Sequence, residues 1–227
     1  MSDSDGKVKL LPVISGLFVG VLILSNVLAA KMVNLGPFVF DGGTLLFPLS
    51  YIFGDILTEV YGYKESRKVI WTGLAALVVM SLNIWIIGAL PADPSWKLQK
   101  SYDDILAQVP RIALASVVGY FAGEYSNSVV LSRMKILTKG RWLWTRTIGS
   151  TLVGEMADTL LFVTIAFAGS YPAQVLVVMI GSNYLFKCGI EAAFTPITYK
   201  VVGFVKKRES VDAYDYGERY NPLPVKS

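Results

Sequence analysis

Five polar or ionisable side chains lie inside two strongly apolar stretches, Thr147–Ala168 and Ala173–Val205. They are Glu155 and Asp158 in the first stretch, and Asn183, Lys187 and Glu191 in the second. Because residues three or four apart share one face of a helix, each group forms a polar stripe. A charge at bilayer depth costs at least about 2.5 kcal/mol, so such groups face a partner or a water-filled cavity. The two stripes therefore predict the lining of one shared site.

The charge balance of this predicted site indicates the kind of ligand. Three acids stand against one lysine, whereas a network that only fixes helix packing, the structural alternative, would tend to be balanced. An excess of acid suits an amine-rich ligand or the uptake of protons. Four aromatic residues lie close by in sequence: Phe162, Tyr184, Phe186 and Phe194. Carboxylates accept hydrogen bonds from ring N–H and amino groups while aromatic rings stack on a flat face. The combination favours a planar nitrogen heterocycle.

A third polar stripe lies in the second apolar stretch of the chain. Tyr51, Asp55 and Glu59 recur at every fourth residue, so they share a helix face. We expect Asp55 inside the bundle and Glu59 near the cytoplasmic interface. In the first stretch, Asn26 is expected to face the bundle, because an unpaired amide in hydrocarbon is costly. The full set of predicted substrate-binding residues is Asn26, Tyr51, Asp55, Glu155, Asp158, Phe162, Asn183, Lys187 and Glu191.

The other polar residues within the predicted spans could serve helix packing as well as ligand binding. Asn83 is expected to hydrogen-bond between helices. Glu124 and Asn127 lie near the inner end of their span, where an interfacial or helix-pairing role is at least as well supported as contact with a ligand.

Composition places the chain among membrane proteins and excludes several kinds of enzyme. Of its 227 residues, 53% are hydrophobic and 17% are charged, whereas soluble domains carry about 25% charged residues. Mean hydropathy is +0.51. Histidine is absent and Cys188 is the single cysteine, which excludes Ser-His-Asp triads, Cys-His nucleophiles, HExxH zinc sites and internal disulfides. We expect no enzymatic activity, no metal and no cofactor.

Six apolar stretches are each long enough to cross a bilayer of about 30 Å. They predict an all-α polytopic membrane protein with one six-helix domain over residues 1–205 and a charged, disordered cytoplasmic tail over 206–227. The first stretch continues to Val33, so we expect an uncleaved span rather than a signal peptide. The six predicted spans are Leu10–Val33, Leu45–Tyr61, Lys68–Leu90, Val109–Leu131, Thr147–Ala168 and Ala173–Val205.

The distribution of Lys and Arg predicts the orientation. One set of span ends carries fourteen of these residues and the opposite set carries four, which places both termini in the cytoplasm. The basic loop over residues 133–146 is therefore expected to be an ordinary cytoplasmic loop rather than a nucleic-acid-binding patch. Three spans followed by three also suggest an inverted repeat, in which the acids of the second and fifth spans correspond.

Two outer segments have local signals. Asn34–Thr44 contains Asp41-Gly42 after β-forming residues, which predicts a turn within a short hairpin or re-entrant loop. This segment is either a lid or a plain connector. Pro91–Gln108 carries Trp96 and Tyr102, which favour an interfacial helix.

Several motifs together resemble a known family. Glu59-Val60-Tyr61-Gly62 and Gly154-Glu155…Asp158-Thr159 are the most specific, and the remaining matches are Ser25-Asn26…Lys31, Phe47-Pro48…Asp55, Phe162 and Lys187…Pro196. Over residues 10–200 the chain resembles the bacterial queuosine precursor transporters, also called the vitamin uptake transporter family.

The resemblance implies a multi-pass protein of the bacterial inner membrane that imports a 7-deazaguanine. The candidates are 7-cyano-7-deazaguanine, 7-aminomethyl-7-deazaguanine and queuine, salvaged for tRNA modification. It also implies a fold similar to the substrate-binding subunits of energy-coupling-factor transporters, without their ATPase. Glu155 or Asp158 would then accept the N1–H and 2-amino edge, and Asn26, Asn183 or Lys187 would contact the carbonyl or a pyrrole substituent. The choice of precursor, the energy source, and whether the protein is a homodimer stay open.

Three alternatives of other kinds remain. The first is a binding subunit that needs a separate ATPase, which would dock on small residues of the first span such as Ser15, Gly16 and Gly20. The second is an intramembrane aspartyl protease around Gly54-Asp55, for which the second acidic motif is absent. The third is a cation channel, for which only the Asn34–Thr44 loop could form a filter.

Overall fold

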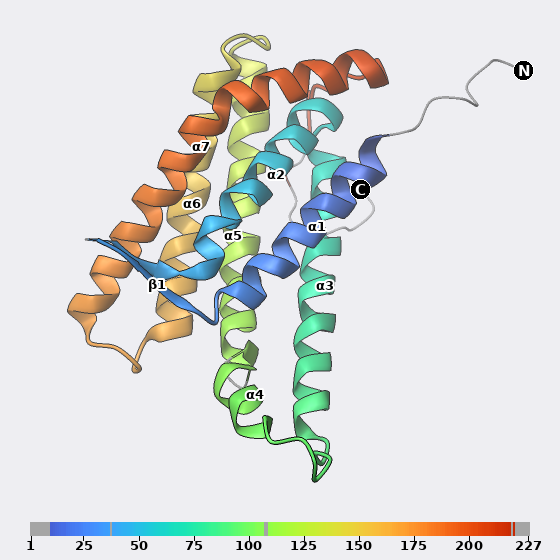
Figure 1. Ribbon diagram of the computed structural model, residues 1–227. Helices are drawn as coiled ribbons and strands as arrows, with labels where there is room; N and C mark the ends of the chain where they lie inside the picture. The colour runs from blue at the N-terminus through green and yellow to red at the C-terminus, as the bar shows by residue number, and fades with distance from the viewer. Residues whose placement is uncertain (1–9, 37, 107–108, 219, 221–227) are drawn as a thin grey trace, which may run out of the picture.

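The computed structural model describes residues 10–36, 38–106, 109–218 and 220, and these are mostly helical (Figure 1). A two-stranded hairpin and one 3-10 turn lie between the first two helices. The helices are α1 (Leu10–Leu28), α2 (Phe47–Tyr61), α3 (Tyr63–Ala89), α4 (Gln99–Leu106), α5 (Val109–Leu137), α6 (Leu143–Phe167) and α7 (Ala173–Glu209). The other elements are β1 (Met32–Leu35), β2 (Phe38–Asp41) and the 3-10 turn η1 (Gly42–Leu45).

Among the described residues, five helical regions are long and apolar enough to cross a membrane: α1, α3, the α4–α5 region, α6 and α7. The second predicted span forms η1 and α2 instead of one long helix. With 15 residues, α2 is about 22 Å long, which is shorter than the hydrocarbon layer. Figure 1 shows α2 beginning part-way along the neighbouring helices. The hairpin and η1 carry the chain to that depth, so α2 does not need the length of a full span.

The hairpin predicted between the first two helices is present, but its turn lies elsewhere. β1 and β2 pair antiparallel in the register Met32–Asp41 to Leu35–Phe38, and Gly36 has a φ of +63° at the turn. Asp41 is instead the N-cap of η1, where its carboxylate accepts the backbone N–H of Thr44 at 3.2 Å. Gly42 and Gly43 come next in the sequence, and the backbone of α1 lies so close to them that a side chain would not fit. A Cβ on Gly42 would be 2.6 Å from the carbonyl oxygen of Leu28.

We expected the C-terminal tail to be disordered, but the part of the tail that the structure describes is ordered. Helix α7 continues to Glu209, and the following residues pack on the end of the bundle. The backbone N–H of Ala213 donates to the carbonyl of Val60 at 3.0 Å. Asp215 accepts the backbone N–H of Tyr63 at 3.0 Å and the hydroxyl of Ser132 at 2.6 Å. Charged residues in the tail therefore have fixed partners on α3 and α5, which composition alone does not reveal.

The same end of the bundle contains a buried ionic network centred on Glu59 of α2 (the Glu59 network). Glu59 is 1% exposed and pairs with the guanidinium of Arg146 on α6. It also accepts a hydrogen bond from Lys206 of α7 at 2.7 Å, and Lys135 of α5 lies 3.6 Å away. Asp212 of the tail bonds Lys135 at 2.6 Å. One carboxylate thus ties four helices and the tail together.

Close approach of α5 and α6 brings the site residues to their places. This is the most extensively packed helix pair in the described chain. Glycines make the approach possible, because a Cβ on Gly154 would lie 2.8 Å from the carbonyl oxygen of Gly123. A Cβ on Gly123 would in turn lie 2.7 Å from the Cβ of Asp158. The backbones therefore touch at the level where Asp158 turns toward the centre of the bundle.

Candidate substrate-binding site

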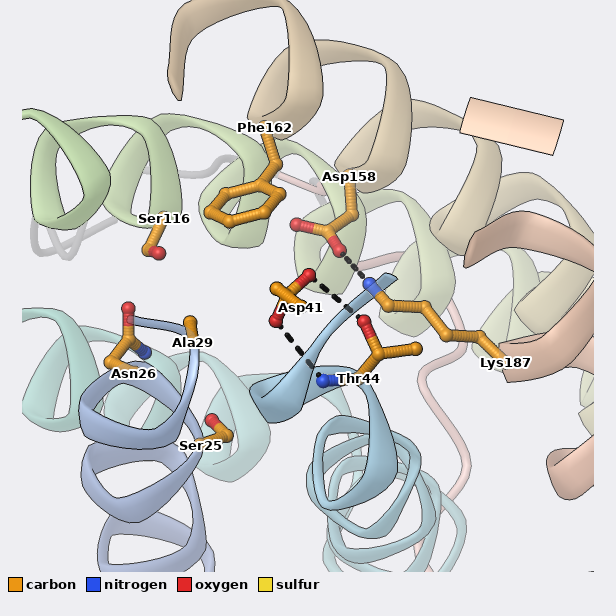
Figure 2. Close-up of a pocket in the computed structure, with 9 residues that line it drawn as sticks. All are labelled: Ser25, Asn26, Ala29, Asp41, Thr44, Ser116, Asp158, Phe162 and Lys187. Atoms are coloured by element: carbon orange, nitrogen blue, oxygen red, sulfur yellow. Dashed lines mark hydrogen bonds and ion pairs between the residues drawn. The ribbon is translucent and has the colours of Figure 1, made fainter. Parts of the chain in front are cut away.

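A small buried cavity lies where α1, the hairpin with η1, α5, α6 and α7 meet (Figure 2). Its volume is about 20 Å³, which is room for about one water molecule. The lining is mostly polar on the α1, hairpin and α7 sides, and Phe162 of α6 covers one side. The lining residues are Ser25, Asn26, Ala29, Asp41, Thr44, Ser116, Asp158, Phe162 and Lys187.

The two polar stripes predicted on α6 and α7 meet at this cavity. The ammonium of Lys187 donates to Asp158 Oδ2 at 2.7 Å and lies 3.2 Å from Glu155 Oε2. All three side chains are at most 5% exposed. Since the ion pair is dry, its attraction is strong, and removing one partner would leave an uncompensated buried charge.

The first helix and the hairpin supply the opposite wall. Asn26 donates from Nδ2 to the carbonyl of Leu22 at 2.9 Å, which leaves its Oδ1 facing the cavity (Figure 2). Thr44 lies 2.9 Å from Asp41 Oδ2 and 3.0 Å from Asn183 Oδ1, so its hydroxyl links the hairpin to α7. Phe40 of β2 stacks on Phe186 of α7 with ring centroids 4.8 Å apart. The hairpin is therefore part of the wall of the site.

Two acceptor atoms at the cavity have no donor. Asn26 Oδ1 and Asp158 Oδ1 are both buried without a hydrogen-bond partner among the described residues. Buried polar atoms are nearly always paired, so unpaired ones indicate a missing water, ion or ligand. Because both atoms are acceptors, the missing molecule must bring donors, as an amine or a ring N–H does.

The structure brings four of the predicted site residues to the cavity and places five outside it. Asn26, Asp158, Phe162 and Lys187 line it. Glu155 and Asn183 lie one contact away, through Lys187 and Thr44 respectively. The other three, Tyr51, Asp55 and Glu191, are buried but do not line the cavity.

The structure corrects the expectation that several aromatic residues line the site. Besides Phe162, the aromatic residues near these stripes point elsewhere: Phe186 packs on the hairpin, Tyr184 bonds the carbonyl of Leu152, and Phe194 is partly exposed. A flat heterocycle does not fit into 20 Å³. The ion pair and Phe162 border the small space that is left.

Sequence reasoning missed five lining residues, of which Ala29 is apolar and the other four are polar. Asp41 and Thr44 were interpreted only as parts of a loop, although Asp-Gly-Gly-Thr is also an N-cap pattern. Ser25 was noted beside Asn26 but not assigned to the site. Ser116 stands in an apolar helix with no neighbouring polar residue that would mark it.

Comparison with known proteins gives a family. The family model described as "Putative vitamin uptake transporter" matches residues 41–201. The chain belongs to this vitamin uptake transporter family. The "Probable queuosine precursor transporter" of Bacillus subtilis is 30% identical over 190 residues, which is 81% of this chain and 82% of the relative. The "Queuosine precursor transporter" of Escherichia coli is 28% identical over 80% of this chain and 81% of the relative. No solved structure matches.

Membership explains the membrane architecture. Named relatives in the vitamin uptake transporter family are transporters rather than enzymes, and the five apolar helices fit a multi-pass bacterial membrane protein. The family match begins at Asp41, so it includes the end of the hairpin, the ion pair of Lys187 and the Glu59 network except Lys206 and Asp212.

A wider hollow lies beside the cavity at the opposite end of the bundle from the Glu59 network. It measures about 480 Å³ and shares Ala29 with the cavity. Phe162 on the cavity side touches Phe167 on the hollow side, with ring centroids 5.9 Å apart. Arg111 of α5 lines the hollow and donates to the carbonyl of Ile165 at 2.8 Å, which fixes the end of α6. The aromatic pair therefore separates the hollow from the buried acceptors.

Proposed function

We propose that this protein imports a 7-deazaguanine precursor of queuosine across the bacterial inner membrane, for salvage into tRNA. The observation that carries the proposal is the pair of unpartnered acceptors, Asn26 Oδ1 and Asp158 Oδ1, in a buried cavity beside a lysine. A guanine-like ring presents N1–H and a 2-amino group on one edge, which two acceptors can receive. Its carbonyl can accept from the ammonium of Lys187. The names of the relatives support the same substrate class.

Each side chain has a defined role in this proposal. Asp158 accepts from the N1–H and 2-amino edge, as a charge-assisted hydrogen bond. Lys187 keeps the carboxylate in place and donates to the carbonyl. Phe162 covers the flat face of the ring, which stacking on an aromatic side chain stabilises. Thr44 and Asp41 hold the hairpin against α7 and close the remaining side.

Substrate entry in this proposal needs a change of shape. The cavity is too small for the ring, while the adjacent hollow is large enough. Rotation of Phe162 away from the cavity, together with a shift of the hairpin, would join the two spaces. The Glu59 network would meanwhile hold the opposite end closed. This conformation is then an occluded state between outward-facing and inward-facing ones.

We further propose that α2 with η1 completes a sixth crossing and that both termini are cytoplasmic. The junction of α2 with α3, the α5–α6 loop and the C-terminal end of α7 lie at one end of the bundle, and these segments together with the adjoining helix ends hold most of the basic residues (Figure 1). Positive loops favour the cytoplasm. Cysteine labelling of Lys139→Cys against Lys97→Cys in a Cys188→Ser background, in intact cells, would locate the two ends.

Uptake by whole cells tests the proposed function. The host should lack its own precursor importer and every ATPase module of the vitamin transporters. We expect uptake of one or more of the three labelled deazapurines, no competition by guanine, and loss of uptake in Asp158→Asn. Glu155→Gln is the matched control, since it makes the same change three residues away and outside the cavity. Uptake that appears only when an ATPase module is supplied would favour the binding-subunit alternative. Full uptake in both variants would reject the assignment of the site.

A further inference from the structure

A second group of buried acids lies between the cavity and the Glu59 network. Asp55 of α2, Glu124 of α5 and Glu191 of α7 are 0%, 0% and 1% exposed. We name these three side chains the carboxyl cluster. Glu124 faces the other two, and its carboxylate lies against the backbone of α2, 2.6 Å from a Cβ built on Gly54. Three carboxyl groups from three helices therefore meet inside the bundle.

The carboxyl cluster has almost no hydrogen-bond donors. Asp55 Oδ1 accepts from Asn127 at 2.8 Å, and this is the one donor found within the described residues while all three acids are ionised. Asp55 and Glu191 lie close enough to share a hydrogen bond once one of them carries a proton. Both oxygens of Glu124, both of Glu191 and Oδ2 of Asp55 have no partner. Five buried acceptor atoms without a donor are far from the usual pattern, in which such atoms are paired.

The nearest cations are already committed elsewhere. Lys187 is bonded to Asp158 beside Glu155, and Arg146 is bonded to Glu59. Burying ionised carboxylates without a compensating charge is very costly, so such groups take up protons or bind a cation. The titratable and charged groups that face the cluster are Tyr51, Glu59, Tyr120, Arg146, Glu155, Asp158 and Cys188. None of them supplies a free positive charge.

A proton fits the cluster better than a metal ion does. Within the part of the chain that the structure describes, no three acidic side chains are placed to hold one metal ion. A proton does not need three acids arranged around one point. A protonated carboxyl group donates a hydrogen bond, which a neighbouring unpaired oxygen can accept. Protonation of the cluster would thus remove the charge and satisfy several unpaired atoms together.

The cluster is linked to the cavity through Tyr51. The ring of Tyr51 is fully buried, and its hydroxyl lies within electrostatic reach of Asp158 and Glu155 as well as of Glu124. A change of charge at Asp158, when a ligand brings N–H donors to it, is therefore felt at Glu124 across a low-dielectric interior. This contact joins the substrate site to the second acidic group.

We propose that Asp55, Glu124 and Glu191 form a proton-binding site that couples substrate uptake to the inward movement of protons. The proposal rests on the proposed transport function. A proton enters from outside through the hollow and the cavity, is held by the cluster while substrate occupies the cavity, and leaves when the Glu59 network opens. No covalent bond changes other than O–H bonds made and broken at the carboxyl groups.

Proteoliposomes containing the purified full chain test the coupling. Counterflow of labelled 7-cyano-7-deazaguanine without any gradient reports transport alone. An inside-alkaline gradient reports coupling, and one pH unit can support up to about tenfold accumulation per proton carried. We expect wild-type protein to show counterflow, accumulation driven by the pH gradient, and substrate-dependent acidification of a trapped pH dye.

Variants locate the site. Glu124→Gln should keep counterflow within about twofold of wild type and lose the accumulation driven by pH, because Glu124 does not line the cavity. Glu191→Gln is the second variant, for use should Glu124→Gln fail to fold. Asp103→Asn, an exposed acid on α4, is the control and should keep both activities.

Each failure has a different meaning. Absence of wild-type counterflow with every deazapurine would overturn the proposed function. Counterflow with no response to the pH gradient, or with a response to a sodium gradient instead, would overturn proton coupling and leave the proposed function standing. A pH response that survives in both Glu124→Gln and Glu191→Gln would show that the cluster is not the coupling site.

Discussion

The ion pair at the cavity makes an asymmetric prediction about stability. Lys187 is the cation that holds two buried acids, Asp158 and Glu155, whereas each acid shares that cation with the other. Lys187→Met therefore leaves two carboxylates without a counter-charge. Asp158→Asn removes one charge-assisted hydrogen bond and leaves the Lys187–Glu155 pair. The lysine substitution should cost more, although lysine and methionine have similar length.

The magnitudes follow from the burial of these groups. Removing the shared partner of a buried ion pair costs about 3–5 kcal/mol. Losing one hydrogen bond to a charged group costs about 1.5–3 kcal/mol. For a chain of this size each kcal/mol lowers Tm by about 2–4 °C. We expect Tm to fall by roughly 10 °C in Lys187→Met and by about half as much in Asp158→Asn.

Thermal unfolding of detergent-purified protein, followed by tryptophan fluorescence, measures both values. Lys97→Met, at an exposed lysine between α3 and α4, is the control and should leave Tm within about 1 °C, because exposed charges contribute little. Were Lys187→Met as stable as Asp158→Asn, or as the control, the assignment of Lys187 as the shared counter-charge would be refuted.

Two further predictions concern other parts of the bundle. Glu59→Gln should lower Tm more than Arg146→Met does. Glu59 is the shared counter-charge of three cations, whereas in Arg146→Met the Glu59 carboxylate still pairs with Lys206 and Lys135. Equal losses in the two variants would contradict the charge count; thermal unfolding measures both. Gly123→Ala should destabilise by more than 1 kcal/mol and reduce uptake, since its Cβ would press on α6, whereas Gly20→Ala, with open space around it, should be neutral. A neutral Gly123→Ala in both assays would argue against the close α5–α6 contact.

The sequence predicted the helices and the two stripes well, because burial in lipid leaves a strong hydrophobic pattern. The meeting of Asp158 with Lys187 followed from the cost of isolated charges at depth. The sequence could not show that Asp55 and Glu191 do not line the cavity. Periodicity tells which residues share a face of a helix, but it does not tell which other helix that face packs against. That choice depends on how the helices pack against one another.

The short α2 and the ordered tail were beyond prediction for another reason. Counting apolar residues finds a span over Leu45–Tyr61, but a hairpin that starts the helix inside the bundle is a tertiary feature. The tail residues Asp212 and Asp215 are polar and close to prolines in sequence, so composition indicates disorder. Their partners, Lys135 and the backbone N–H of Tyr63, become visible only in three dimensions.

Equilibrium binding to purified protein tests the central claim most directly. The claim is that the acceptors at the cavity, above all Asp158, receive the donor edge of a 7-deazaguanine. Titration calorimetry should show binding of at least one of the three precursors to wild type and no binding of guanine at the same concentration. Asp158→Asn should weaken that binding by roughly 10- to 150-fold, which corresponds to about 1.5–3 kcal/mol. Unchanged affinity in a folded Asp158→Asn protein, or no binding of any precursor to wild type, would contradict the account.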